Sequence, residues 1–468
     1  MPRAYRLAAS GSPGTLASRK GSPMLEWACA LLIGLLVVQP ADPAPEPQAP
    51  DRSAAVKQAV EAAGKKGFSG VVLAAVDGEP IAVVAVGRNA NGAPPKPDTL
   101  FEIASVTKTM TAAAVVRLAD MGKLSLDDPI SKHLPGVPAN CRAITIRHLL
   151  QHTSGIPGTN SEGGGDDLRA VLPVFLKGGP RHKPGTHFEY WNQGYALLSE
   201  IIARAAGEPY TSAMRRLVFE PAGMKSTVFT GDRAPTGASV AQGRSRMGPP
   251  RSALEHPYGA YGFQYRGMGG VVTNVRDMLR FDRALADEDL FGGPNADVMF
   301  EPGQSGYALG WLVRRGPYGE VHEHTGLVRG FTAVSRRYAD RDGFIVVLCN
   351  DDAQDFRLLV DAIEAALYAG TEDRVEGGKG VVPLVGLYTG ERGSLLVIEA
   401  VAPDAAAARI VWSEDGPVTR GLIKMGADGR FTFDDGSSKL VLTAIEAEGR
   451  VMGVRIDAGD RSMTYTRE

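Results

Sequence analysis

The chain has 468 residues, of which 44% are hydrophobic and 22% are charged, as in ordinary globular proteins with a large core. Its length suggests two or three domains. A formal net charge of −2 gives no sign of nucleic-acid binding or of a polybasic membrane-binding surface.

The first 50 residues are typical of an export segment followed by a linker. A basic stretch precedes an apolar run over 27–38, and a Pro/Ala-rich stretch follows over 40–50. The short apolar run favours a signal peptide, but the long basic stretch and the lack of a clear cleavage site leave an uncleaved anchor open. We therefore expect an exported protein, periplasmic or secreted, that touches a membrane only if this segment is retained. Beyond it, Cys141 and Cys349 are too few for a disulfide framework, so we expect two buried, unpaired thiols.

The elements that follow begin and end with strands. Residues 54–63 suit a helix, and 70–76 and 81–87 suit strands joined by a turn at Asp77-Gly78. The middle of the chain, 125–289, mixes helices with Gly- and Pro-rich loops, which are often binding loops or lids.

Strand signals return over 307–314, 331–338 and 344–349, and a helix is expected over 356–368. Strands at both ends with helices between them predict an α+β fold. We expect an antiparallel sheet flanked by helices and completed by both ends of the domain, plus a helical lobe.

The remaining boundaries follow from composition. The glycine- and charge-rich stretch 371–380 is expected to be a linker, and regularly spaced turns predict a small all-β barrel or sandwich over 381–468. The domain plan is therefore an export segment and linker over 1–50, a main domain over 51–370, the linker, and the C-terminal β domain.

Ser105-Val106-Thr107-Lys108 carries the first candidate chemistry. Residues three apart share a helical face, so the hydroxyl and the amine can meet, and a serine nucleophile needs such a neighbouring base. Met110, Ala114 and Leu118 form an apolar stripe that ends at Gly122, which predicts a helix. Ser105 is then near the helix N-terminus, where free backbone N–H groups favour developing negative charge.

Two further motifs are Tyr190-Trp191-Asn192 and His324-Thr325-Gly326. Together with the serine motif and the stretches 146–155 and 268–277, they resemble the penicillin-recognising serine hydrolases: class C β-lactamases, DD-peptidases and related esterases. The resemblance covers roughly 52–370. It implies a β-lactamase/transpeptidase-like fold, with the active site in a groove between the sheet and the helical lobe.

The resemblance implies roles for the first two motifs. Ser105 attacks a carbonyl carbon and forms an acyl-enzyme, and the base is either Lys108 or Tyr190. Both side chains are mostly protonated at pH 7 unless their pKa values shift, so the sequence leaves the two alternatives open. Asn192 is expected to hold the substrate amide or the Lys108 ammonium, and Trp191 either packs in the core or narrows the pocket.

The resemblance also makes His324, Thr325, Gly326 and Leu327 the expected substrate-binding residues. The backbone N–H groups of Leu327 and Ser105 are expected to form the oxyanion hole. Near the start of the C-terminal domain, Gly386-Leu387-Tyr388 resembles the lipocalin-like barrels appended to some family members.

Two of these residues depart from the family pattern. His324 replaces the lysine of most β-lactamases, which argues against strong β-lactamase activity, and its ordinary pKa near 6.5 predicts pH-dependent activity. Leu327 replaces the hydroxyl residue that binds a substrate carboxylate in many DD-carboxypeptidases. That weakens the carboxypeptidase interpretation, unless Arg314, Arg315 or Arg329 supplies the contact.

No metal or cofactor is expected. His322 and His324 alternate along a predicted strand without a third ligand at suitable spacing. His148 and His152 are one helical turn apart but lack the glutamate of zinc-protease motifs, so we interpret both as structural.

These features predict a serine hydrolase that acts on an amide, ester or peptide, with a small-molecule or peptide substrate and no nucleic-acid partner. Three alternatives stay open. The first is a penicillin-binding sensor or pseudoenzyme that is acylated without turnover, the second is a true class C-like β-lactamase, and the third is a structural cell-envelope module dominated by its barrel.

Overall fold

The computed structural model describes residues 51–158, 165–246, 248–286, 290–291, 293, 295–316, 318–354 and 357–368, and eight strands within 386–467. The predicted export segment over 1–50 and the linker over 371–380 lie outside the described residues. Within the described part of the chain, no helix is both long and apolar enough to cross a membrane.

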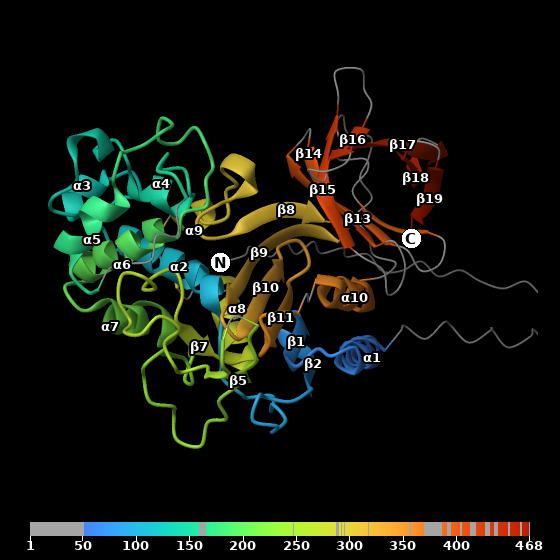
Figure 1. The fold of residues 1–468 in the computed structure, drawn as a ribbon, viewed down its shortest axis with the longest axis horizontal. Coiled ribbons are helices and arrows are strands. Elements are labelled where there is room, and N and C mark those ends of the chain that lie inside the picture. Colours follow the sequence, from blue (N-terminus) through green and yellow to red (C-terminus); the bar gives the residue numbers. More distant parts are fainter. Residues whose placement is uncertain are drawn as a thin grey trace, which may run out of the picture. The chain divides into compact units, whose positions relative to one another are not determined.

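An antiparallel sheet forms the centre of the main domain. Its strand order is β8 (Leu312–Gly316), β9 (Gly319–Val328), β10 (Phe331–Tyr338), β11 (Gly343–Cys349), β1 (Gly70–Val76) and β2 (Glu79–Val86). β1 pairs with β11 on one side and with β2 on the other, so both ends of the domain meet in the sheet (Figure 1). The predicted hairpin turn is confirmed: Asp77 and Gly78 have φ values of 52° and 70°.

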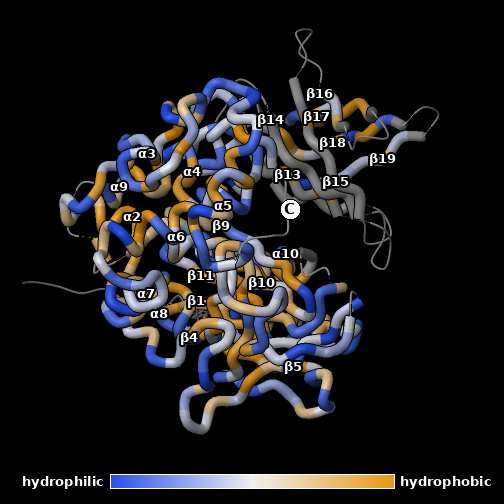
Figure 2. The backbone as a smooth tube through the Cα atoms, turned by 60° about the vertical axis from the view of Figure 1, so that its left-hand side comes forward, coloured by the Kyte–Doolittle hydropathy of each residue, from blue (hydrophilic) through white to orange (hydrophobic). Residues whose placement is uncertain are grey.

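Helices cover both faces of this sheet. α1 (Arg52–Lys65) and α10 (Arg357–Tyr368) pack on one face, and α8 (Val275–Ala286) packs against β1 and β11 on the other. β11 shows the period of two that this requires: Phe344, Val346 and Leu348 enter one hydrophobic core, and the alternate residues enter the other. Figure 2 shows hydrophobic residues along β1, β10 and β11.

A helical lobe surrounds α2 (Thr107–Asp120). Its other helices are α3 (Ile130–His133), α4 (Ile146–Leu150), α5 (Leu168–Phe175), α6 (Asn192–Ala206), α7 (Tyr210–Met214) and α9 (Asn295–Val298). Three consecutive alanines, Ala112, Ala113 and Ala114, lie in the buried part of α2, where small side chains allow α6 and α7 to approach closely. The predicted α+β fold is confirmed.

The rest of the main domain contains short strands and single turns of helix. They comprise β3 (Phe101–Glu102), β4 (Val228–Phe229), β5 (Gln242–Gly243), β6 (Arg251–Ser252) and β7 (Val271–Thr273), the 3-10 turns η1 (Ala104–Val106), η2 (Ala139–Cys141) and η4 (Gln304–Gly306), and the π turn η3 (Arg215–Phe219). β3 and β4 both pair with β7, and β5 pairs with β6.

The strand predicted over 307–314 is partly wrong, because β8 begins at Leu312. Gly306 and Gly310 have positive φ values of 74° and 81°, which interrupt extended backbone. Gly310 also packs on α2, where an added Cβ would lie 2.9 Å from the carbonyl oxygen of Lys108. Close helix contact has therefore replaced the first half of the predicted strand.

The C-terminal strands form the predicted small all-β domain. They are β12 (Gly386–Gly390), β13 (Leu395–Ala402), β14 (Ala405–Val411), β15 (Val418–Met425), β16 (Phe431–Asp434), β17 (Lys439–Ala447), β18 (Arg450–Ala458) and β19 (Arg461–Arg467). Each pairs antiparallel with the next, and β12 pairs with both β13 and β19, which closes the barrel. Leu396, Phe433 and Ile456 are among its buried residues. Its likeness to lipocalins and the domain boundaries stay predictions.

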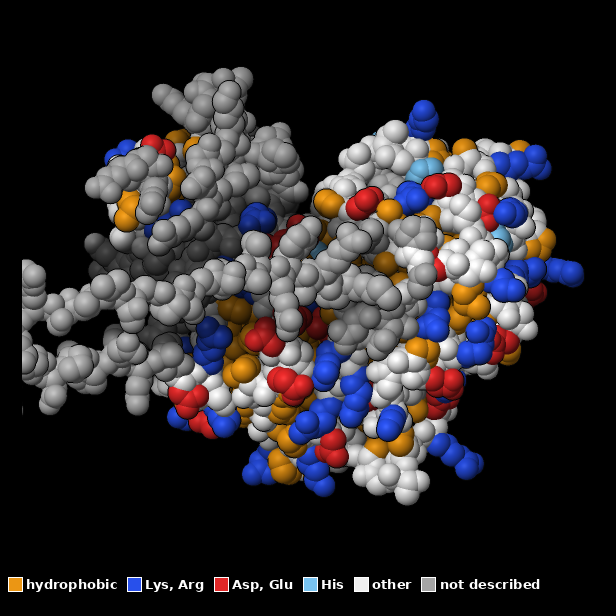
Figure 3. All heavy atoms as spheres, turned by 180° about the vertical axis from the view of Figure 1, so that it is seen from behind, with side chains coloured by type: hydrophobic (Ala, Val, Ile, Leu, Met, Phe, Trp, Pro, Cys, Tyr) orange, Lys and Arg blue, Asp and Glu red, His pale blue; other side chains and the backbone are white. Residues whose placement is uncertain are grey.

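The two cysteines and the surface charges of the described residues match the composition. Cys141 and Cys349 are buried and free, as expected, and burial raises the pKa of the Cys349 thiol to about 11. On the face shown in Figure 3, the acidic and basic side chains of the described residues are interspersed, which agrees with the near-zero net charge.

Candidate active site

Ser105 lies on a sharp turn between β3 and α2. The turn is the 3-10 segment η1, and its first residue, Ala104, adopts a left-handed φ of 44° that costs a non-glycine residue about 1 kcal/mol. The serine therefore precedes α2 rather than lying within it. It remains one turn from Lys108, at the helix N-terminus that the sequence predicts.

Lys108 is fully buried beneath Ser105. Its Nζ atom donates to Ser105 Oγ at 3.0 Å and to the carbonyl oxygen of Met268 at 3.1 Å. The amine also lies 5.0 Å from the ring centre of Tyr190 and 5.5 Å from that of Tyr195. Burial lowers the pKa of Lys108 well below its usual value, which favours the neutral amine.

Tyr190 comes from the segment just before α6. Its ring packs against His152, with the ring centres 4.2 Å apart, and its hydroxyl hydrogen-bonds to Ser105. Although 36% of the residue is exposed, burial of the phenol raises the pKa of Tyr190 to about 12, and the Ser105 contact opposes this rise. The phenol is therefore protonated at neutral pH.

His324 lies on β9 and is buried. Its Nδ1 atom contacts the carbonyl oxygen of Thr325 at 2.7 Å and must donate there, so Nε2 accepts from the hydroxyl of Tyr307 at 2.9 Å. Burial, followed by the nearby Lys108, lowers the pKa of His324 to about 3. The expectation that His324 titrates near pH 6.5 is therefore wrong, because the sequence could not show how deeply it is buried.

Gly326 brings β9 against the turn that carries Ser105. A Cβ atom at this position would lie 2.2 Å from the carbonyl oxygen of Ile103, so only glycine fits. Its neighbours Thr325 and Leu327 have exposed side chains, and Leu327 is 63% exposed. The third motif thus lies beside Ser105.

The first residue of α6 is Asn192, which is half-buried. Trp191, just before it, is only 2% exposed and belongs to the core of the lobe. An added Cβ at Gly194 would lie 3.0 Å from the indole ring. Of the two alternatives for Trp191, the structure favours the core residue.

Two residues of the site escaped sequence reasoning. His152, interpreted as structural, has a left-handed φ of 55°, and its Nδ1 accepts from the backbone N–H of Trp191 at 3.0 Å. Its ring packs against Tyr190 and against Tyr307, which the sequence had not singled out. By contrast, His148 is structural as expected, because it forms a capping box with Thr145 at the start of α4.

Other candidate residues pair elsewhere. Arg314 binds Glu323 at 2.8 Å, and Arg315 and Arg329 lie 3.5 and 3.8 Å from Asp340 and Glu255, respectively. His322 contacts Glu320 at 2.8 Å and stacks on Phe300. Among the described residues, no cluster of three or more histidine, cysteine or acidic side chains is arranged to hold a metal ion.

This geometry agrees with comparisons to known proteins. A family model described as Beta-lactamase matches residues 54–369. The chain belongs to this family. AmpH of Escherichia coli, a D-alanyl-D-alanine-carboxypeptidase/endopeptidase, is 31% identical over 50% of the chain, and PbpX of Bacillus subtilis is 33% identical over 54%.

The matches do not extend over whole relatives. The chain covers 62% of the length of AmpH and 63% of that of PbpX. Among solved structures, a D-stereospecific amidohydrolase from Streptomyces has a TM-score of 0.56 and 27% identity. That match covers 68% of this chain and 99% of the amidohydrolase. The predicted resemblance to β-lactamase-related serine hydrolases is confirmed by these findings.

Proposed function

We propose that the chain is a serine hydrolase in which Ser105 attacks a carbonyl carbon and forms an acyl-enzyme. The observation that carries this proposal is the 3.0 Å contact between Ser105 Oγ and the buried amine of Lys108, with the Tyr190 hydroxyl on the same serine. A serine beside a base and a second proton-handling group suits acyl transfer.

The two alternatives for the base differ in protonation state. The lowered pKa of Lys108 favours an amine with a free lone pair, which can take the Ser105 proton once the hydroxyl turns toward it. The pKa of Tyr190, about 12, keeps a proton on the phenol at neutral pH. Lys108 is therefore the proposed base, and Tyr190 the proposed donor to the leaving group.

Acylation begins with the attack of Ser105 on the carbonyl carbon. The bond from Ser105 Oγ to the carbonyl carbon forms, the hydroxyl proton passes to Lys108, and the carbonyl oxygen gains negative charge. The backbone N–H groups of Ser105 and Leu327 are proposed to stabilise that charge. The bond to the leaving group breaks as Tyr190 gives it a proton, and Lys108 returns a proton to the phenol. In deacylation, water takes the place of the leaving group: it attacks the acyl carbon and gives a proton to Tyr190 as the phenol passes its own proton to Lys108. The bond to Ser105 Oγ then breaks, and Lys108 returns the proton to the serine.

We propose that the substrate is an uncharged amide or ester, with amides of D configuration favoured by the name of the D-stereospecific amidohydrolase from Streptomyces. The neutral His324 has both ring nitrogens engaged, and the exposed Leu327 is apolar, so neither side chain supplies a partner for a substrate carboxylate. Placing a substrate carboxylate beside His324 and Leu327 costs free energy, because the carboxylate loses water and gains no partner from either side chain. β-Lactams and free-acid D-peptides are therefore expected to be poorer substrates.

A matched pair of substrates tests this proposal. A D-alanyl-D-alanine peptide with a C-terminal amide differs from its free acid only in the carboxylate. We expect kcat/KM to be at least about tenfold higher for the amide, equivalent to about 1.4 kcal/mol. Leu327→Ser should reduce the difference in kcat/KM between the amide and the free acid, because the added hydroxyl group can donate to the carboxylate. A preference for the free acid, or for a cephalosporin, would contradict the proposed substrate class.

The non-enzymatic alternatives have different kinetics. A sensor or pseudoenzyme releases at most one equivalent of product, whereas the proposed enzyme continues to a steady state. Export by residues 1–50 is part of the proposal. It is tested by fractionating cells and determining the N-terminus of the mature protein by mass spectrometry.

A further inference from the structure

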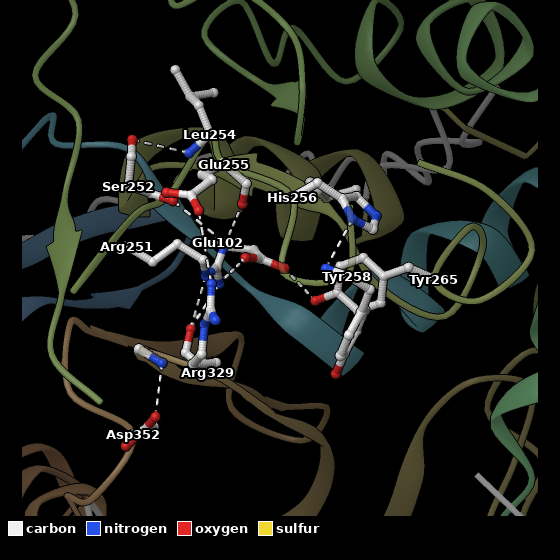
Figure 4. Close-up of polar contacts among 12 residues, drawn as sticks. Glu102, Arg251, Ser252, Leu254, Glu255, His256, Tyr258, Tyr265, Arg329 and Asp352 are labelled. Atoms are coloured by element: carbon white, nitrogen blue, oxygen red, sulfur yellow. Dashed lines mark hydrogen bonds and ion pairs between the residues drawn. The ribbon is translucent and has the colours of Figure 1, made fainter. Parts of the chain in front are cut away.

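A buried ion pair lies close to the proposed site without being part of its chemistry. Glu102 and Arg251 are both fully buried, and the Arg251 guanidinium donates to one carboxyl oxygen of Glu102. The hydroxyl of Tyr265 donates to the other oxygen, so the carboxyl group lies between the two partners (Figure 4). Burying an ion pair costs desolvation free energy unless its polar atoms are fully hydrogen-bonded, so the presence of such a pair is weak evidence that it stabilises the fold. Its three-way arrangement instead indicates a role in fixing local structure.

Each partner belongs to a different backbone segment of the site. Glu102 is in β3, three residues before Ser105. Tyr265 begins a turn closed by the hydrogen bond from Gly269 N–H to its carbonyl oxygen at 3.0 Å. Within that turn, the carbonyl oxygen of Met268 accepts from Lys108. Through Tyr265, Glu102 thus connects the segment that leads to Ser105 with the turn whose Met268 carbonyl oxygen binds Lys108.

Arg251 extends the connection to β9. Its Nη2 and Nε atoms donate to the carbonyl oxygen of Arg329 at 2.8 and 3.1 Å, two residues beyond Leu327. The guanidinium also donates to the carbonyl oxygen of Glu255 and lies 5.0 Å from the ring centre of Phe331. Its planar donors therefore hold the turn between β9 and β10 and the Glu102 carboxyl at the same time.

The turn at Arg329 is held from other sides as well. Asp352 accepts from the backbone N–H of Gly330 at 2.8 Å (Figure 4). Gly243, which pairs with Arg251 across β5 and β6, packs on this turn, and a Cβ there would lie 2.3 Å from the carbonyl oxygen of Gly330. The turn has little room to move, so the position of Arg329 constrains the end of β9.

We propose that Arg251, oriented by Glu102, is a positioning residue that sets the spacing between the backbone N–H groups of Ser105 and Leu327. Glu102 fixes the segment leading to the first group, and the contact with Arg329 fixes the segment following the second. This inference rests on the proposed function, because it assigns the two amides to the oxyanion hole. A shift of about 1 Å in such groups can lower a rate about 100-fold.

The test compares Arg251→Met with Arg336→Met. Arg336 is an equally buried arginine that binds Glu323 on β9 and Glu364 on α10, whereas Arg251 holds the carbonyl oxygen of Arg329 in the turn after β9. Both variants should lower the melting temperature, because each leaves a buried carboxyl group without its cation. Only Arg251→Met should lower kcat/KM about 10- to 100-fold, mainly through kcat, since it changes transition-state stabilisation.

A pair of esters provides a readout that loss of stability would not move. A thiono ester places sulfur, a poor hydrogen-bond acceptor, where the ordinary ester places oxygen. If Arg251 positions the oxyanion hole, Arg251→Met should reduce the ratio of oxo-ester to thiono-ester kcat/KM at least about tenfold, and Arg336→Met should leave it within about twofold. Arg251→Lys should give a ratio between those of the wild type and Arg251→Met. If Arg251→Met does not fold, the ratio of Arg251→Lys tests the proposal.

An unchanged ratio in the folded Arg251 variants would overturn the proposal and leave the ion pair a purely structural feature. Failure of the proposed function gives another result. In that case the wild-type protein does not hydrolyse either ester, or Ser105→Ala hydrolyses them as fast as the wild type.

Discussion

Gly326→Ala probes the closest backbone approach in the proposed site. The added Cβ would lie 2.2 Å from the carbonyl oxygen of Ile103 and 3.2 Å from the Cβ of Ala104, whereas ordinary contacts begin near 3.4 Å. β9 must therefore move about 1 Å from the turn that carries Ser105, and such a displacement can cost about 100-fold in rate. Overpacking of this kind typically destabilises a protein by about 1–3 kcal/mol.

Gly70→Ala is the matched control, because its Cβ would lie 2.1 Å from the carbonyl oxygen of Leu348, between β1 and β11. We expect both variants to melt at lower temperature. At a temperature where both are folded, only Gly326→Ala should lose about 100-fold in kcat and in its rate of labelling by a fluorophosphonate. Wild-type activity in folded Gly326→Ala, or an equal loss in Gly70→Ala, would refute the reasoning.

Three further predictions concern protons. Because the amine of Lys108 acts when neutral, activity should fall as the pH drops through the lowered pKa of Lys108. His324→Asn should keep this acidic limb of the pH–rate profile, since the pKa of His324 is already about 3. Loss of the acidic limb in His324→Asn would contradict the prediction. Lys108→Met, Tyr190→Phe and the double variant should each lose a similar large factor in kcat, since parts of one proton-transfer unit are not additive, whereas strictly multiplicative losses would show separate action. Burial alone would raise the pKa of Asp128, but hydrogen bonds from Lys132, the backbone N–H of Ser125 and His133 lower it to about 2. The ionised carboxylate of Asp128 therefore stabilises the folded protein above the unfolded pKa of 3.8. The stability deficit of Asp128→Asn in thermal melts should shrink between pH 3.8 and 2, and a constant deficit would argue against it.

Sequence patterns predicted those parts of the fold that depend on local residues. The Asp77-Gly78 turn and the alternating apolar residues of β11 specify a hairpin and a buried strand whatever their surroundings. The i, i+3 spacing of Ser105 and Lys108 likewise predicts their contact directly. By contrast, only family resemblance indicated that Tyr190 would join them.

The misses have long-range causes. The first half of the strand predicted over 307–314 did not form because Gly310 lies against α2, a contact that neighbouring residues in the sequence do not reveal. The pKa of His324 depends on its burial, and its partner Tyr307 was not recognised from the sequence. The ion pair between Glu102 and Arg251 joins residues 149 positions apart, and no periodicity or motif marks either one.

The central claim is that Ser105 carries the acyl group. The most direct measurement is intact-protein and peptide mass spectrometry after a brief reaction with a slowly hydrolysed ester or a fluorophosphonate. A single adduct on the peptide that contains Ser105, absent from Ser105→Ala together with turnover, is the predicted result. An adduct on another residue, or turnover by Ser105→Ala at the wild-type rate, would contradict it.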